Sequence, residues 1–212
     1  MKSINNAANR VTIARVLFIP VFLVVLLGEW PQFIPSPDRW NAAKPWIAAA
    51  VFALLAATDA VDGYLARSRN EVTTFGKFID PLADKLLVTA ALVALVDLDR
   101  LPSWIALVII SRELIVSGLR MVAVAEGKVI AASSWGKVKT ILQIVAIVAF
   151  IVKDSPVTSQ VAGSTAAVAL AWGSWGVMGL AVIVTILSMI DYFYHARDII
   201  TGPWSGRSDD AV

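Results

Sequence analysis

Two residue types that build many active sites are almost absent from this sequence. The 212-residue chain has no cysteine and a single histidine, His195. The lack of cysteine excludes disulfides, thiolate nucleophiles and sulfur-bound metals, and one histidine leaves little room for imidazole-bound metals. Any metal ion in this protein should therefore be a hard cation held by oxygen ligands, such as magnesium, manganese or calcium.

Charged residues are also scarce. They make up 16% of the chain, whereas 58% of the residues are hydrophobic, and the mean hydropathy is +0.75. A soluble domain would be nearer to about 45–50% apolar. The basic residues are dispersed and the net charge is only +2, so we expect no nucleic-acid partner. Long runs with almost no charge predict an all-α integral membrane protein that lies in a lipid bilayer.

The apolar runs predict six transmembrane helices in a single catalytic domain that covers residues 1–212. The expected spans are about 11–27, 46–65, 75–96, 103–125, 134–152 and 175–194. Prolines mark residues 28–45 as a loop, and residues 154–171 are expected to form a second long loop. Residues 3–10 are expected to be a short interfacial segment ahead of a retained first helix, and a polar tail is expected from about residue 197.

The distribution of lysine and arginine predicts the orientation of these helices. Six spans place both termini and the second and fourth connections on one side of the membrane, and most of the basic residues outside the spans lie there. The opposite side carries only Arg39, Lys44, Arg100 and Lys153. By the positive-inside rule, we expect a multi-pass protein of the cell membrane with its second connection facing the cytoplasm.

Four aspartates lie around that second connection. An acid inside a membrane helix costs about 2.5–3.5 kcal/mol, so a group of them is expected to hold something positively charged. Asp59 and Asp62 fall within about 60° on one helix face, and Asp80 and Asp84 share a face of the next helix. Two antiparallel helices would bring the four carboxylates together, with enough oxygen for two divalent cations.

Small residues and an arginine accompany these aspartates. Gly63 and Gly76 lie inside the predicted helices, where glycine costs about 1 kcal/mol relative to alanine, and they indicate close approach by a ligand or another backbone. Ala66 leaves room on the acidic face, and Arg67 can bind phosphate through its guanidinium group. Together with two metal ions, these residues would form a binding site for a pyrophosphate.

The spacing of these residues resembles a known family signature. Asp59-x2-Asp62-Gly63-x2-Ala66-Arg67-x8-Gly76-x3-Asp80-x3-Asp84 is similar to the motif of the CDP-alcohol phosphatidyltransferase family, with every position filled. The resemblance implies the six-helix CDP-alcohol phosphotransferase fold and a homodimer. It also implies transfer of a phosphatidyl group from CDP-diacylglycerol to an alcohol, with release of CMP.

The same resemblance implies roles for individual residues. Two Mg²⁺ (or Mn²⁺) ions would be bridged by Asp59 and Asp80, with Asp62 completing one metal site and Asp84 the other. Asp84 would also be the general base that deprotonates the acceptor alcohol. The residues that would contact the CDP-lipid are Gly63, Ala66, Arg67, Thr73 and Gly76.

A second set of cations indicates the acceptor. Arg112 and Arg120 lie in the fourth predicted helix, and Lys137 and Lys139 open the fifth. Such a set suits a phosphate-bearing acceptor, and these segments resemble the phosphatidylglycerophosphate synthase branch of the family, whose acceptor is glycerol 3-phosphate. The two lysines differ by about 200° on a helix, so both can face one pocket only if the helix has not yet begun. Either lysine could instead reach lipid phosphates, and Arg112 could instead pair with Glu113.

Other functions stay open at this point. The acceptor could be inositol phosphate, serine or phosphatidylglycerol. Prenyltransferases also bind a diphosphate through magnesium and aspartates, although their acidic motifs lack the spacer with Gly63, Ala66 and Arg67. A cation transporter would place its acids near the middle of the bilayer and repeat its halves, whereas here the acids lie towards helix ends and no internal repeat is visible.

Overall fold

The computed structural model describes the backbone of residues 7–29, 33, 36–68, 74–125 and 134–201. Within the helices, it leaves undescribed the side chains of residues 7–11, 59–68, 74–84, 124–125, 134–137, 159, 161–162 and 195–201. In this part of the chain the structure is all-α, with six helices in succession. They are α1 (Ala7–Leu27), α2 (Pro37–Ser68), α3 (Thr74–Asp97), α4 (Ser103–Ala125), α5 (Ser134–Val152) and α6 (Pro156–Thr201).

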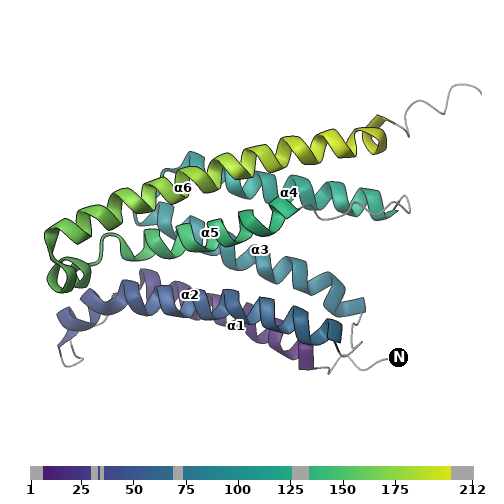
Figure 1. The fold of residues 1–212 in the computed structure, drawn as a ribbon. Coiled ribbons are helices and arrows are strands. Elements are labelled where there is room, and N and C mark those ends of the chain that lie inside the picture. Colours follow the sequence, from purple (N-terminus) through teal and green to yellow (C-terminus); the bar gives the residue numbers. More distant parts are fainter. Residues whose placement is uncertain (1–6, 30–32, 34–35, 69–73, 126–133, 202–212) are drawn as a thin grey trace, which may run out of the picture.

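The six helices run alternately up and down in one bundle. α1 packs against α2 and α3, α5 packs against α2 and α6, and α4 packs against α3 and α6. These contacts close a ring in the order α1, α2, α5, α6, α4, α3, and α3 and α5 also touch. Figure 1 shows α1 and α2 on one side of the bundle, α4 and α6 on the other, and α3 and α5 between them.

Hydrogen bonds tie together the end of the bundle where α1, α3 and α5 finish. Lys44 donates to the carbonyl of Gly28 at 3.0 Å, and Arg100 donates to the carbonyl of Ile151 at 2.7 Å. Asp99 adopts a left-handed conformation (φ 54°) in the tight turn between α3 and α4, a conformation that aspartate tolerates better than most residues. Arg39, Lys44, Arg100 and Lys153 thus all belong to this end, as the sequence predicts.

Two of the expected loops are partly wrong. Residues 28–45 were expected to be a loop because of their prolines, but α2 begins at Pro37. Proline is favourable in the first turn of a helix, where its missing N–H has no partner to lose. Pro45 lies inside α2 and is buried, so packing outweighs the backbone hydrogen bond that a proline cannot make.

The expected loop over residues 154–171 is also wrong, because α6 begins at Pro156 and continues to Thr201. Gly163 interrupts it with φ 81° and ψ 166°, a conformation that glycine reaches without a steric cost. The segment therefore consists of two helices that meet at a bend. The helix also extends beyond the predicted start of the polar tail near residue 197. The other predicted boundaries lie within a few residues of the observed ones, apart from the first helix, which begins at Ala7.

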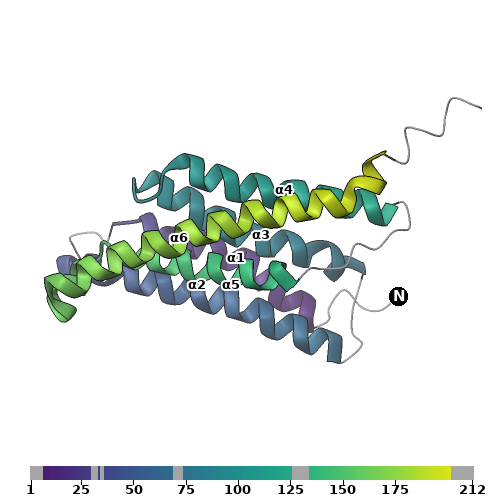
Figure 2. The same ribbon diagram turned by 45° about the horizontal axis from the view of Figure 1, so that its top comes forward.

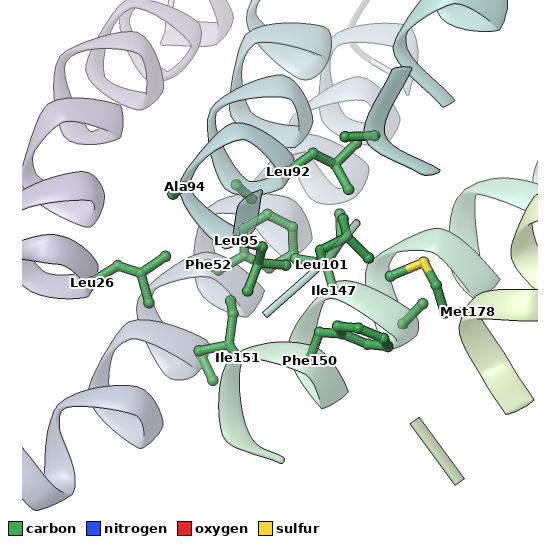
Figure 3. Packing of buried hydrophobic residues seen from close by; sticks show 14 of the residues in the cluster. Leu26, Phe52, Leu92, Ala94, Leu95, Leu101, Ile147, Phe150, Ile151 and Met178 are labelled. Atoms are coloured by element: carbon green, nitrogen blue, oxygen red, sulfur yellow. The ribbon is translucent and has the colours of Figure 1, made fainter. Parts of the chain in front are cut away.

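Apolar side chains from all six helices form one core, which lies away from the acidic stretch. Phe22 and Phe52 meet with their ring centres 5.6 Å apart, and Phe150 packs edge-to-face on Trp175 at 5.0 Å. Figure 3 shows Phe52 and Phe150 together with other residues of this core, among them Leu26, Leu95, Leu101, Ile151 and Met178. The core therefore fixes how the helices are arranged at their non-acidic halves.

The outer surface of the bundle is also apolar. Leu17, Leu54, Leu107 and Ile141, on four different helices, each expose between 63% and 68% of their surface. In the described residues, Pro37–Thr58 and Gly163–Tyr194 are long and apolar enough to cross a membrane, and only 22% and 33% of their apolar windows are buried. Soluble proteins rarely expose apolar patches of this extent, so the surface suits a lipid environment.

Candidate active site

One end of the bundle gathers the segments that the sequence singles out. α1 starts there, α2 ends, α3 starts, α4 ends, α5 starts and α6 ends, as Figures 1 and 2 show from two directions. We call this the polar end. These starts and ends meet because consecutive helices run in opposite directions.

The acidic stretch is helical on both sides of the connection at residues 69–73. Asp59, Asp62, Gly63, Ala66 and Arg67 belong to the last three turns of α2. Their helical backbone confirms the 100° spacing on which the shared acidic face depends.

The partner residues Gly76, Asp80 and Asp84 belong to the first half of α3. The side chains of residues 59–84 lie outside the described part, as does Thr73 altogether. Among the side chains that are described, no group of acids is close enough to hold a metal ion. The convergence of the four aspartates thus stays a prediction. The helical backbone at all four positions is compatible with it.

The inward faces of the helices change character towards the polar end. On α5 the buried stripe reads Lys139, Gln143, Ala146, Ile147 and Phe150, polar at one end and apolar beyond it. The corresponding polar positions on the other helices are Thr12 and Arg15 of α1, Arg112 of α4, and Thr185 and Ser188 of α6. Polar side chains this well buried are rarely there for packing alone, so this half of the bundle is a candidate binding site.

A buried ion-pair network links α4 to α5. Glu113 Oε1 pairs with Lys139 Nζ and lies 3.1 Å from Arg112 Nη1. The side chains of Lys139 and Arg112 are 3% and 9% exposed, and that of Glu113 is 22% exposed. Two cations therefore share one carboxylate, so the described members of this network carry a net positive charge in a site with little access to water.

Arg112 is also anchored to α6. Its Nη2 donates to Ser188 Oγ at 2.6 Å, which fixes the guanidinium group between α4 and α6. Its Nε has no hydrogen-bond partner among the described residues. Arg112 thus keeps a donor that could bind a ligand.

Lys85 joins the same network from α3. Its Nζ donates to Ser117 Oγ, and this hydroxyl donates in turn to the backbone carbonyl of Glu113 at 2.6 Å. Since Lys85 directly follows Asp84, the network reaches the residue next to the proposed general base. The acidic stretch and the cationic site are therefore joined through the backbone of α3.

The other two predicted acceptor-binding cations are Arg120, which stands apart from this network, and Lys137, which cannot be placed in it or outside it. Arg120 is exposed, and its guanidinium carbon lies 5.7 Å from the centre of the Tyr192 ring, a cation–π contact with α6. Lys137 lies in α5, and its side chain is outside the described part. α5 has already begun at Ser134, so Lys137 and Lys139 differ by about 200°. The structure assigns the inward direction to Lys139.

Sequence reasoning missed the central position of Glu113. It treated Glu113 only as an alternative partner of Arg112. A glutamate in a span rich in Leu, Ile and Val was the available signal, since such a residue needs a partner. Which cation it pairs with depends on how α4 and α5 are packed, and the sequence does not state this.

An apolar groove approaches the acidic stretch from the outside of the bundle. It lies between α1 and α2, has a volume of about 370 Å³, and is lined by Arg15, Phe18, Val51, Leu54 and Thr58, among others. Thr58 directly precedes Asp59 in α2. An apolar chain in this groove would therefore end beside the acidic stretch.

Comparison with known proteins gives consistent results. Residues 5–192 match the family model of the CDP-alcohol phosphatidyltransferases. The CDP-diacylglycerol–glycerol-3-phosphate 3-phosphatidyltransferase of Bacillus subtilis is 45% identical over 153 residues, which are 71% of this chain and 79% of the relative. The corresponding protein of Haemophilus influenzae is 36% identical over 186 residues, 85% of this chain and 92% of the relative.

A third relative is a probable phosphatidylglycerophosphate synthase of Mycobacterium tuberculosis, 39% identical over 197 residues that cover 92% of this chain and 84% of the relative. The family model covers most of the chain and includes the acidic stretch and the cationic network. The resemblance inferred from the aspartate spacing is therefore confirmed. The chain belongs to the CDP-alcohol phosphatidyltransferase family and is a membrane-associated transferase enzyme.

Proposed function

We propose that this enzyme transfers the phosphatidyl group of CDP-diacylglycerol to glycerol 3-phosphate, which yields phosphatidylglycerol phosphate and CMP. The observation that carries the choice of acceptor is the network of Arg112, Lys139 and Glu113. A buried site with excess positive charge suits a phosphate-bearing acceptor better than serine, which carries no net charge. The relatives named for glycerol 3-phosphate support the same choice.

The proposed metal site consists of Asp59, Asp62, Asp80 and Asp84. Four carboxylates on two consecutive helices form a set of hard oxygen donors that fits Mg²⁺ or Mn²⁺. Two such ions, when bound, would polarise the pyrophosphate of the donor and stabilise the CMP that leaves. Arg67, with Gly63, Ala66, Thr73 and Gly76, would contact the CDP group beside them.

The chain's own residues would carry out the remaining steps. Lys139 and Arg112 hold the phosphate of the acceptor, and Asp84 takes the proton from its hydroxyl group. The hydroxyl oxygen then forms a bond to the lipid-bearing phosphorus, while the bond from that phosphorus to the CMP oxygen breaks. The groove between α1 and α2 suits an acyl chain of the donor.

The orientation belongs to the same proposal. We place the polar end at the cytoplasmic face of the cell membrane, with all six helices crossing the bilayer. The distribution of the basic residues supports this. Most of those outside the predicted spans belong to the termini and to the second and fourth connections, whereas only Arg39, Lys44, Arg100 and Lys153 belong to the opposite side. The exposed Trp46 and Trp104 lie in the first parts of α2 and α4, and the exposed Trp172 lies nine residues after the bend of α6 at Gly163, towards the side where an outer aromatic belt would be. The homodimer implied by the family resemblance stays a prediction.

An assay with different acceptors tests the reaction. Purified protein in detergent, supplied with CDP-diacylglycerol and Mg²⁺, is expected to release CMP with glycerol 3-phosphate. It is expected to release at least about tenfold less with inositol phosphate or serine, because neither matches both the charge and the size of the site. Faster turnover of inositol phosphate than of glycerol 3-phosphate would contradict the proposed acceptor.

Removal of divalent cations tests the metal requirement separately. Treatment with EDTA is expected to lower CMP release to the background level, and added Mg²⁺ or Mn²⁺ is expected to restore it. The melting temperature of the protein, measured in parallel, shows whether the loss comes from unfolding instead. Full turnover in EDTA would contradict the proposed role of the four aspartates.

A further inference from the structure

A small cavity lies between α3, α4 and α5, one turn deeper in the bundle than Asp84. It has a volume of about 20 Å³ and is lined by Lys85, Val88, Glu113, Thr140, Gln143 and Ile144. Lys85 directly follows Asp84, and Val88 lies one helical turn beyond it. The cavity thus adjoins the carboxylate that pairs with Lys139 and the residue that directly follows the proposed general base.

Gln143 stands out among the residues that line this cavity. It is 95% buried, since its relative exposure is 5%. Its Nε2 has no hydrogen-bond partner among the described residues. A buried amide without a partner costs about 1–3 kcal/mol, so its place beside a cavity of this size leaves room for a ligand group to provide the missing hydrogen bond.

The dimensions and the lining limit what that ligand group can be. A cavity needs about 10–15 Å³ to hold one water-sized group, so this one accepts a hydroxyl group but not a phosphate. Val88 and Ile144 provide an apolar side, whereas Glu113, Thr140 and Gln143 provide polar groups. A carbon atom that bears a hydroxyl group presents both kinds of surface.

The position on α5 connects this cavity to the phosphate site. Gln143 lies one helical turn after Lys139 on the same buried stripe, about 6 Å further along the axis. Glycerol 3-phosphate has its phosphate and its secondary hydroxyl group on neighbouring carbon atoms. An acceptor with its phosphate near Lys139 would therefore bring that hydroxyl group towards Gln143.

We infer that Gln143 is a specificity-determining residue, whose amide hydrogen-bonds the secondary hydroxyl group of the acceptor in this cavity. The inference rests on the proposed function and adds the group that selects a polyol phosphate. The amide carries both a donor and an acceptor, and so does a hydroxyl group, so either orientation of the amide makes the bond. The residue thereby selects among phosphorylated alcohols after Lys139 and Arg112 have selected the phosphate.

The test compares two acceptors that differ only in this hydroxyl group. 3-Hydroxypropyl phosphate keeps the phosphate and the attacking primary hydroxyl group of glycerol 3-phosphate but lacks the secondary one. The wild-type enzyme is expected to prefer glycerol 3-phosphate by about 10- to 100-fold in kcat/KM, because the analogue leaves the amide without a partner. Gln143→Met keeps the length of the side chain but removes its hydrogen bonds, and it is expected to bring this preference to within about twofold of unity.

A control and a second variant keep the result interpretable. Gln160→Met changes an exposed glutamine of α6 and is expected to leave both the preference and the melting temperature unchanged. If Gln143→Met does not fold, Gln143→Ala provides the same comparison. Equal losses with both acceptors at an unchanged preference would assign Gln143 a structural role and overturn the inference. So would a wild-type enzyme that uses both acceptors equally well, whereas no turnover of glycerol 3-phosphate would contradict the proposed function itself.

Discussion

Replacement of Asp84 by asparagine is expected to lower the rate of CMP release by at least about 100-fold. Asparagine has almost the same shape as aspartate but cannot take a proton from the acceptor, and general-base catalysis contributes about 10²–10⁴-fold to a rate. The variant also loses a negative charge from the proposed metal site. The rate is measured at saturating concentrations of both substrates, over a series of Mg²⁺ concentrations that separates a loss of metal affinity from a loss of turnover.

Asp97→Asn provides the matched control on the same helix. Asp97 is the last residue of α3, is exposed, and lies at the end of the bundle away from the acidic stretch. This variant is expected to keep wild-type turnover. If Asp84→Asn kept more than about a tenth of the wild-type rate at saturating Mg²⁺, the proton would have to go to another group.

The second large effect concerns Glu113 and Lys139. Glu113→Gln removes the Glu113 carboxylate from Lys139, whose side chain is 3% exposed, and so takes a negative charge away from a buried ammonium group. Breaking a buried pair in this way costs about 3–5 kcal/mol of folding free energy. We therefore expect a clear drop in the melting temperature of the protein in detergent.

The double variant separates stability from binding. Lys139→Met in the Glu113→Gln background also removes the buried ammonium group, so most of the lost stability is expected to return. The KM for glycerol 3-phosphate is expected to stay raised by about 10- to 100-fold, because a charge-assisted hydrogen bond to the phosphate contributes about 1.5–3 kcal/mol.

Thermal unfolding and initial rates are measured on Glu113→Gln, on Lys139→Met and on the double variant. A double variant with a normal KM would mean that Lys139 stabilises the fold and does not bind the acceptor. A KM that rises in Lys139→Met alone but not in the double variant would place the effect on the freed Glu113 carboxylate instead.

The strongest sequence patterns gave accurate elements. α4 and α5 begin and end at the residues that the hydropathy pattern predicts, because each is an apolar run bounded by polar residues. The prolines were less informative. Pro37 starts a helix and Pro45 lies inside one, since the effect of a proline depends on where the helix begins and on what packs around it.

The candidate site divides in the same way. The motif from Asp59 to Asp84 depends only on the spacing of residues along two consecutive helices, so the sequence is enough to identify the family. The cationic site needed the packing of α4 against α6 and α5. The sequence predicts four cations at the acceptor site. In the structure, Arg112 and Lys139 both pair with the Glu113 carboxylate, and Arg120 makes a cation–π contact with Tyr192. The side chain of Lys137 lies outside the described part.

The sequence by itself determined the membrane class, the helical spacing of the four aspartates and the family, because each depends on local periodicity and composition along one segment. Only the tertiary structure decided that Glu113 joins Arg112 to Lys139 and that Gln143 lines a small cavity beside Lys85. The rotation and depth of each helix in the bundle set these contacts. They depend on how side chains from different helices pack together, and no single segment encodes that packing.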